Sequence, residues 1–152
     1  MSRTVLLKSG TLVNEGKKEV LDILIKNGRI EKIAPSISTS ENCTVVDVSG
    51  KFILPGCIDD QVHFREPGLT HKANLFTESR AAVAGGVTSF MEMPNTVPNA
   101  LTQELLQDKY DIASKQSIAN YSFFMGASND NVEEVLKTNE NFHGLFNGQY
   151  VG

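Results

Sequence analysis

The sequence predicts an α/β protein in two parts, a small antiparallel β module over residues 1–55 followed by parallel βα units over residues 56–152. Residues 4–55 hold only short strand-like segments separated by turn residues. From residue 56 onward, strand-like and helix-like segments alternate, which is typical of parallel βα units. The Pro55-Gly56 pair breaks the pattern between the two parts.

Turn-forming pairs divide the first part into short strands. The predicted strands are Thr4–Ser9, Thr11–Val13, Leu21–Lys26, Arg29–Ile33, Thr44–Val48 and Lys51–Leu54. Asn27-Gly28 is the pair that best supports a type I′ hairpin turn. Ser49-Gly50 predicts a second hairpin, between the last two strands. An antiparallel module follows from these turns.

The second part alternates three strands with three helices. The predicted strands are Cys57–Asp59 continuing as Gln61–Phe64, Val87–Met93 and Ala119–Met125, with a fourth strand opening at Gly144–Phe146. The predicted helices are Ala73–Ala84, Thr102–Lys115 with Thr102 as N-cap, and a short helix to Lys137 capped by Asp130 with Glu133. A (β/α)8 barrel needs roughly 200 residues or more. About three of its eight units would therefore fit here.

Composition excludes several classes of partner. The net charge of −4 argues against nucleic acid and anionic membrane surfaces. No apolar run approaches the roughly 18 residues of a membrane span, and the segment after Thr4 is strand-like, so we expect no signal peptide. Cys43 and Cys57 are too few for a disulfide framework. We expect a cytosolic (cytoplasmic) protein with reduced thiols that binds a small molecule, and we leave open a homo-oligomer.

His63 and Arg65 are the first candidates for chemistry. They are two residues apart, so on a strand they project from the same face, and Glu66-Pro67-Gly68 then ends the strand. In a βα barrel this end of the strand is the catalytic rim. There an imidazole can hold a metal and a guanidinium can bind a carboxylate with two hydrogen bonds. A lone His-x-Arg is more often a packed histidine beside a surface salt bridge, so the surrounding motifs decide.

Those motifs resemble the dihydroorotases of the amidohydrolase superfamily. Pro55-Gly56-Cys57-Ile58-Asp59 matches the lead-in to the family's first barrel strand, and His63–Gly68 is similar to its His-x-Arg-x-Pro-Gly extension. Gly85–Thr88 and Met91–Pro98 resemble its second-strand signature. The similarity runs from about residue 5 to residue 140, in the expected order.

The resemblance implies a metal-dependent hydrolase (β/α)8 (TIM) barrel that uses Zn2+. His63 would be a zinc ligand in the substrate site, and Arg65 with Asn95 would bind the substrate carboxylate. Asn95 alone is better explained as a turn residue in Pro94-Asn95-Thr96, and Arg65 at an adjacent rim position makes the binding role at least as good an explanation. Gln61 stands where the family's first metal-binding histidine usually stands, which makes it a doubtful metal ligand. The implied reaction is the reversible hydrolysis of dihydroorotate to N-carbamoyl-aspartate in pyrimidine biosynthesis.

Two alternatives remain beside this interpretation. Hydantoinases and dihydropyrimidinases share the scaffold but handle uncharged rings, so Arg65 with Asn95 favours a dihydroorotase. A non-catalytic paralogue that serves as a scaffold is the other, and Gln61 supports it. His71 is expected to be a solvated loop residue and His143 a structural one.

We expect the 152 residues to be an N-terminal portion that is inactive alone. The family's remaining metal ligands and its general-base aspartate come from later strands. Similarity is lost abruptly after Gly144, and a frameshift within Phe146–Tyr150 would explain that loss.

Overall fold

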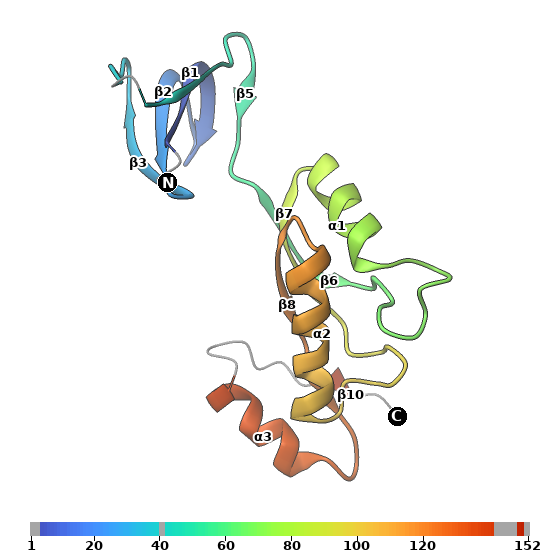
Figure 1. Ribbon diagram of the computed structural model, residues 1–152. Helices are drawn as coiled ribbons and strands as arrows, with labels where there is room; N and C mark the ends of the chain where they lie inside the picture. The colour runs from blue at the N-terminus through green and yellow to red at the C-terminus, as the bar shows by residue number, and fades with distance from the viewer. Residues whose placement is uncertain (1–3, 40–41, 142–148, 151–152) are drawn as a thin grey trace. The chain divides into compact units, whose positions relative to one another are not determined.

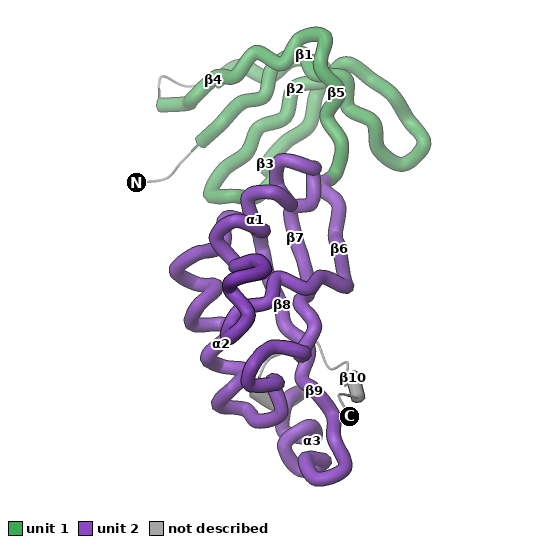
Figure 2. Tube along the Cα trace, turned by 90° about the vertical axis from the view of Figure 1, so that its right-hand side faces the viewer, with its two compact units in different colours: residues 1–55 green, residues 56–152 purple. Residues whose placement is uncertain are grey.

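The computed structural model describes residues 4–39, 42–141 and 149–150. The chain divides into two units, Met1–Pro55 (unit 1) and Gly56–Gly152 (unit 2), which are coloured separately in Figure 2. Each unit is described by itself. No helix of the described ranges is long and apolar enough to cross a membrane.

Unit 1 is a single mixed sheet with the strand order β3-β2-β1-β4, and β5 also pairs with β1 (Figure 1). Its strands are β1 (Thr4–Asn14), β2 (Lys17–Lys26), β3 (Arg29–Ala34), β4 (Thr44–Asp47) and β5 (Phe52–Ile53). β1, β2 and β3 are consecutive antiparallel neighbours. The antiparallel prediction is confirmed for these three strands.

Two-residue loops join the antiparallel strands of unit 1. Asn27 and Gly28 both have positive φ, at 52° and 75°, as a type I′ turn requires, so the predicted hairpin is confirmed. Glu15 and Gly16 form a second loop of this kind, with φ of 49° and 74°. The sequence did not predict this loop, because glutamate is not a residue that favours the left-handed region.

The predicted hairpin at Ser49-Gly50 is wrong. Both β4 and β5 pair with β1 in the parallel direction, so the chain does not reverse between them. Residues 48–51 instead form a turn, in which the amide of Lys51 donates to the carbonyl of Val48 at 3.0 Å. This turn spans an irregularity of β1 between Leu7 and Gly10 and returns the chain to the same edge. A turn pair alone does not distinguish such an excursion from a hairpin.

Unit 2 follows the predicted alternation of strands and helices. Its elements are β6 (Cys57–Val62), α1 (Leu75–Ala84), β7 (Val87–Glu92), α2 (Gln103–Gln116), β8 (Asn120–Phe123), β9 (Gly126–Ala127), α3 (Val132–Asn141) and β10 (Gln149–Tyr150). β6, β7 and β8 are parallel neighbours in that order, and β9 pairs in parallel with β10. Figures 1 and 2 show α1 and α2 side by side along this sheet. The predicted strand at Gly144–Phe146 lies outside the described residues.

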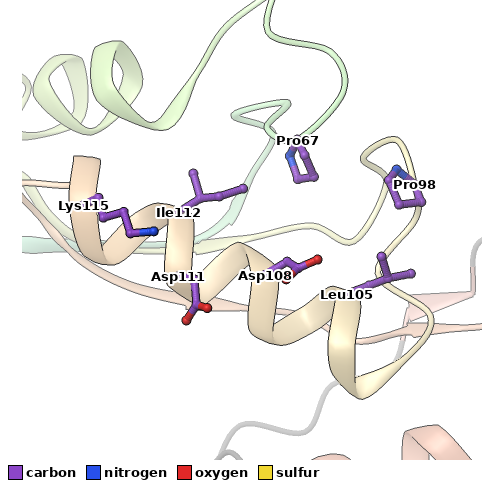
Figure 3. A pocket seen from close by; sticks show the side chains of 7 residues that line it. All are labelled: Pro67, Pro98, Leu105, Asp108, Asp111, Ile112 and Lys115. Carbon is purple, nitrogen blue, oxygen red and sulfur yellow. The ribbon is translucent and has the colours of Figure 1, made fainter.

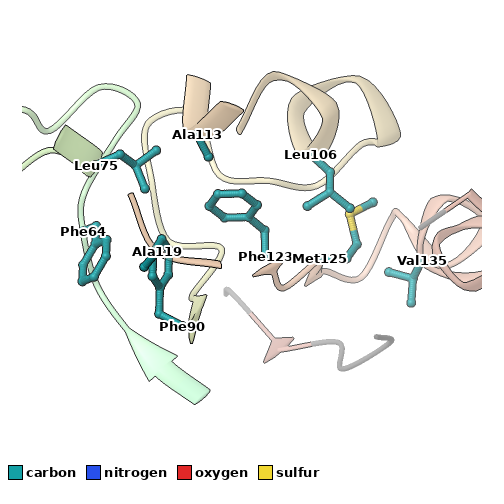
Figure 4. Close-up of a cluster of buried hydrophobic side chains, with 9 residues drawn as sticks. All are labelled: Phe64, Leu75, Phe90, Leu106, Ala113, Ala119, Phe123, Met125 and Val135. Atoms are coloured by element: carbon teal, nitrogen blue, oxygen red, sulfur yellow. The ribbon is translucent and has the colours of Figure 1, made fainter. Parts of the chain in front are cut away.

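The helices of unit 2 cover an aromatic and aliphatic core (Figure 4). Phe64 and Phe90 lie with their ring centroids 4.5 Å apart. Leu75 of α1 and Leu106 of α2 are fully buried against the same cluster. Burial of these side chains fixes the two helices on the sheet, and thereby the strand ends that carry the candidate site.

Local hydrogen bonds set where the helices begin. Thr102 caps α2 as predicted, since its hydroxyl accepts the amide of Leu105 at 3.2 Å. Asn74 caps α1 in the same way through the amide of Thr77, at 2.9 Å. The predicted cap at Asp130 is wrong, because α3 begins at Val132.

Candidate substrate-binding site

The carboxyl ends of β6 and β7 lie next to each other. Val62, the last residue of β6, pairs with Glu92, the last residue of β7. The amide of Met93 donates to the carbonyl of Val62 at 2.9 Å and continues this pairing past the strand ends. The segments that follow, His63–Arg65 and Met93–Asn95, therefore leave the sheet side by side. In open parallel sheets this edge is the usual position of ligand sites.

His63 and Asn95 meet at this edge. Nδ1 of His63 lies 3.0 Å from Oδ1 of Asn95. In the tautomer that carries its proton on Nδ1, the ring donates to this amide oxygen and Nε2 is available to a ligand. His63 is exposed and Asn95 is half-buried. The two residues that the sequence placed on adjacent strand ends are thus in contact.

Arg65 lies beyond the strand. β6 ends at Val62, and Arg65 has a positive φ of 68°, so the expectation that His63 and Arg65 project together from one strand is wrong. The chain turns here because the amide of Arg65 donates to Oε1 of Glu92 at 2.9 Å. The Arg65 side chain is half-buried, and its guanidinium has no hydrogen-bond partner within the described residues.

Beneath these segments lies a buried ion pair that the sequence did not predict. Nζ of Lys109 in α2 is 3.1 Å from Oε2 of Glu92, and both side chains are 1% exposed. Nζ also donates to the carbonyl of Met93 at 2.9 Å. Burial raises the pKa of Glu92 and lowers that of Lys109, and in each case the partner's charge opposes the shift.

The burial of Lys109 could have been predicted from the sequence. Leu106, Lys109 and Ala113 recur at spacings of three and four, so they share one face of α2, and all three are buried. A lysine on the apolar face of a helix needs a buried anion. Glu92, at the end of β7 between Met91 and Met93, was the matching anion, although no feature of the sequence assigned it a role.

The loop between β6 and α1 and the loop between β7 and α2, called the rim loops below, are also joined to each other. The amide of Val97 donates to the carbonyl of Pro67 at 3.2 Å. The carboxylate of Glu66 accepts the amide of Leu75 at 2.9 Å and the side-chain amide of Gln116 at 3.3 Å. These bonds tie the first loop to the start of α1 and the end of α2.

The residues at this edge can be tested for their fit to a metal ion. No group of three or more His, Cys, Asp or Glu side chains that could hold a metal occurs among the residues the structure describes. His63 fits as one ligand, because the contact of Nδ1 with Asn95 fixes the ring and leaves Nε2 for a metal ion. Gln61 is exposed and lies where the pairing of β6 with β7 is irregular, between Asp59 and Val62. Its amide oxygen would be a weak, neutral ligand.

A separate cleft lies between the rim loops and α2 (Figure 3). Its volume is about 390 Å3. It is lined by Pro67, Pro98, Leu105, Asp108, Asp111, Ile112 and Lys115. None of His63, Arg65 and Asn95 contributes to it, so the cleft is not the polar site at the strand ends.

Solved structures define the class of protein. An L-hydantoinase (dihydropyrimidinase) from Arthrobacter aurescens matches 99% of this chain with a TM-score of 0.85 at 26% identity, and the match covers 36% of that chain. A dihydropyrimidinase from Brevibacillus agri NCHU1002 matches 95% with a TM-score of 0.77 at 25% identity, over 32% of its own chain. The chain thus has the fold of the matching third of these hydantoinases of the amidohydrolase superfamily, and the complete (β/α)8 barrel stays a prediction.

The sequence comparisons identify the family. The dihydro-orotase-like family matches residues 50–148, and the chain belongs to that family. A dihydroorotase from Lactococcus lactis subsp. lactis is 44% identical over 117 residues, which cover 76% of this chain and 27% of the relative. One from Streptococcus pneumoniae serotype 4 is 37% identical over 142 residues, which cover 92% of this chain and 31% of the relative. The chain spans about a third or less of the length of these relatives.

Proposed function

We propose that His63, Arg65 and Asn95 belong to the active site of a dihydroorotase and lie where the carboxylate of the substrate binds. Such an enzyme reversibly hydrolyses the ring amide of dihydroorotate to N-carbamoyl-aspartate in pyrimidine biosynthesis. One observation carries the proposal. Arg65 is an arginine without an anionic partner among the described residues, and its backbone is fixed beside the His63–Asn95 pair. A ring substrate that bears a carboxylate complements this cation, whereas an uncharged ring does not.

Each of the three residues has a role in the proposal. The guanidinium of Arg65 binds the substrate carboxylate, and the amide nitrogen of Asn95 donates a further hydrogen bond to it. His63 uses its bare Nε2 as one ligand of a Zn2+ ion, and Asn95 fixes the ring by accepting from Nδ1. When bound, zinc would polarise the ring carbonyl and lower the pKa of a water molecule. Gln61 is a doubtful further ligand, and the family's remaining ligands would come from other strands.

A hydantoinase activity is the second candidate. The solved structures named above are a hydantoinase and a dihydropyrimidinase, and one of them superposes on nearly the whole chain. Substrate charge separates the two activities, because hydantoins lack the carboxylate that Arg65 would bind.

A chimera tests the proposal directly. Residues 1–141 would be joined to the remaining barrel of the Streptococcus pneumoniae dihydroorotase, which aligns with 92% of this chain. We expect Zn2+-dependent turnover of dihydroorotate, and we expect Arg65→Ala to lower kcat/KM by about 10- to 100-fold, as for lost hydrogen bonds to a charged group.

Lys72→Ala is the matched control, because it removes an exposed cation from the loop that follows Gly68. It should leave kcat/KM within about twofold. Equal losses in the two variants would contradict the binding role of Arg65. Turnover of hydantoin without turnover of dihydroorotate would favour the second candidate. The 152-residue chain assayed alone should show no turnover.

A further inference from the structure

Two of the contacts that fix the segments after the strand ends are made by one ion pair. Oε1 of Glu92 accepts the amide of Arg65 at 2.9 Å, and its Oε2 lies 3.1 Å from Nζ of Lys109. The same Nζ donates to the carbonyl of Met93 at 2.9 Å. One carboxylate and one ammonium group therefore contact both segments that follow the strand ends.

Arg65 needs such a contact. Its φ of 68° lies in the left-handed region, which a residue with a long side chain adopts only when its surroundings hold it there. A carboxylate that accepts the amide supplies a charge-assisted hydrogen bond for this purpose. The strand ladder has already ended at Val62, so the Arg65 backbone is held by this bond to its amide and by the bond from the Leu69 amide to its carbonyl at 3.1 Å.

Lys109 acts on the second segment. Met93 is two residues before Asn95, and its amide is bound to the carbonyl of Val62 while its carbonyl is bound to Lys109. With both sides of this residue fixed, Asn95 comes to lie where its side chain meets His63 at 3.0 Å.

Stability alone does not account for the pair. Replacing a buried ion pair with apolar residues of similar volume is often neutral or stabilising, because desolvation offsets the attraction between the charges. Both side chains are 1% exposed, so the desolvation is nearly complete. A positioning role explains why two charged groups lie at this point in the core.

We propose that Glu92 and Lys109 are positioning residues of the carboxylate clamp, holding Arg65 and Asn95 in the geometry that selects a ring substrate with a carboxylate. This inference rests on the proposed function for its substrate. It assigns selectivity to two buried residues that do not touch the ligand.

The test separates positioning from stability with two variants of the 152-residue chain. Glu92→Leu with Lys109→Met replaces the pair by apolar residues and should cost less stability than removing one partner alone. Leu106→Ala removes a fully buried side chain one turn earlier in α2 and should destabilise the fold while keeping the pair. Urea denaturation confirms that each variant is folded.

Two NMR measurements then report on the clamp. The first is hydrogen exchange of the Arg65 amide, which should become about 10-fold faster in the double variant. The second is titration with N-carbamoyl-L-aspartate and with hydantoin, followed by amide shifts. In the double variant, the Kd for N-carbamoyl-L-aspartate should rise about 10-fold, whereas the Kd for hydantoin should stay the same. Leu106→Ala should preserve the local protection of Arg65 and the preference between ligands.

The outcomes distinguish the two proposals. A double variant that keeps both the protection of the Arg65 amide and the affinity for N-carbamoyl-L-aspartate overturns the positioning role. If the unmodified chain does not prefer N-carbamoyl-L-aspartate over hydantoin, the proposed function fails. The positioning role is then tested by hydrogen exchange of the Arg65 amide alone. Faster exchange in the double variant, but not in Leu106→Ala, supports that role, and equal exchange in the two variants overturns it.

Discussion

Asp22 in unit 1 and Glu92 in unit 2 perform the same backbone task in different surroundings. Asp22 is 2% exposed and accepts the amide of Ser9 at 2.8 Å, where φ is 60°. Glu92 is fully buried and accepts the amide of Arg65 at 2.9 Å, where φ is 68°. In both units a buried carboxylate holds a residue other than glycine in the left-handed region.

The charges of the two carboxylates are balanced differently. Asp22 accepts a second amide, from Ile37 at 2.9 Å, and these backbone donors lower its pKa. Burial instead raises the pKa of Glu92, and Lys109 opposes that shift. Neutral donors are sufficient where the held residue only shapes a strand irregularity. After β6 and β7, the carboxylate of Glu92 contacts one segment and the added cation of Lys109 contacts the other, so one ion pair holds both.

Removing the charge of Lys109 in unit 2 should cause the largest loss of stability. Lys109→Met leaves Glu92 buried without its partner and should lower the free energy of unfolding by about 3–5 kcal/mol. Lys8→Met is the counterpart in unit 1, since Lys8 is exposed and its charge is the weakest influence on the pKa of Asp22. That change should stay within about 0.5 kcal/mol. Urea denaturation measures both, and similar losses would remove the distinction between the two carboxylates.

Much of the fold was predictable because it depends on local chemistry. Asn27-Gly28 and Thr102 have side chains or backbones suited to one local structure, and both predictions are confirmed. Ser49-Gly50 was misread because the direction of β5 is set by its pairing with β1, far away in the sequence. Glu15-Gly16 was missed because the pairing of β1 with β2 forces glutamate into a positive φ.

The candidate site was predictable only in part. Motif spacing placed His63 and Asn95 on neighbouring strand ends, where the structure brings them into contact. The left-handed turn at Arg65 could not be predicted, because it depends on a carboxylate 27 residues later in the chain. The binding roles of these residues, and that of Gln61 toward metal, stay predictions.

Two glycines with positive φ give the next largest effect. Gly68→Ala places a methyl group against the backbone carbonyl and side chain of Val97 in addition to the strain of φ at 81°. We expect a loss of about 3 kcal/mol, from left-handed strain together with overpacking. Gly28→Ala has φ at 75° and open space around the added methyl group, so strain alone costs about 1 kcal/mol.

The difference between the two glycine variants measures how closely the rim loops approach each other. Thermal unfolding monitored by circular dichroism is sufficient to compare them. Equal losses would show that the loop of Gly68 moves away from Val97 at little cost, which would weaken the case for a fixed rim.

A smaller effect, a gain in stability, is expected at Glu15, whose positive φ is not held by a buried carboxylate. Glu15→Asn replaces a residue that tolerates φ of 49° poorly with one that favours a type I′ hairpin. The free energy of unfolding should rise by about 0.5–1 kcal/mol. Asn27→Ala, at the equivalent place in the next hairpin, should lower it by a similar amount. A Glu15→Asn variant that is no more stable would show that glutamate is not strained there.

Lowering the pH distinguishes the two carboxylates, because the contributions of Asp22 and Glu92 to stability change in opposite directions. Neither change is large near neutral pH. The pKa of Asp22 is lowered from 3.8 by its backbone donors, so its contribution is present above that value and is lost as the pH falls through the folded pKa. The pKa of Glu92 is raised from 4.5 by burial, so its contribution to stability is present below that value and is lost as the pH rises through the folded pKa. Both oxygens of Asp22 accept backbone amides, so protonation removes one acceptor, whereas protonation of Glu92 at Oε2 leaves Oε1 for the amide of Arg65.

Acidification from about pH 5 to pH 2 should therefore expose the Ser9 amide to exchange before the Arg65 amide. Asp22→Asn should flatten the acid response at Ser9 and leave that at Arg65 unchanged. Simultaneous loss of both amides would mean that the two carboxylates titrate alike, and that Lys109 rather than burial sets the pKa of Glu92.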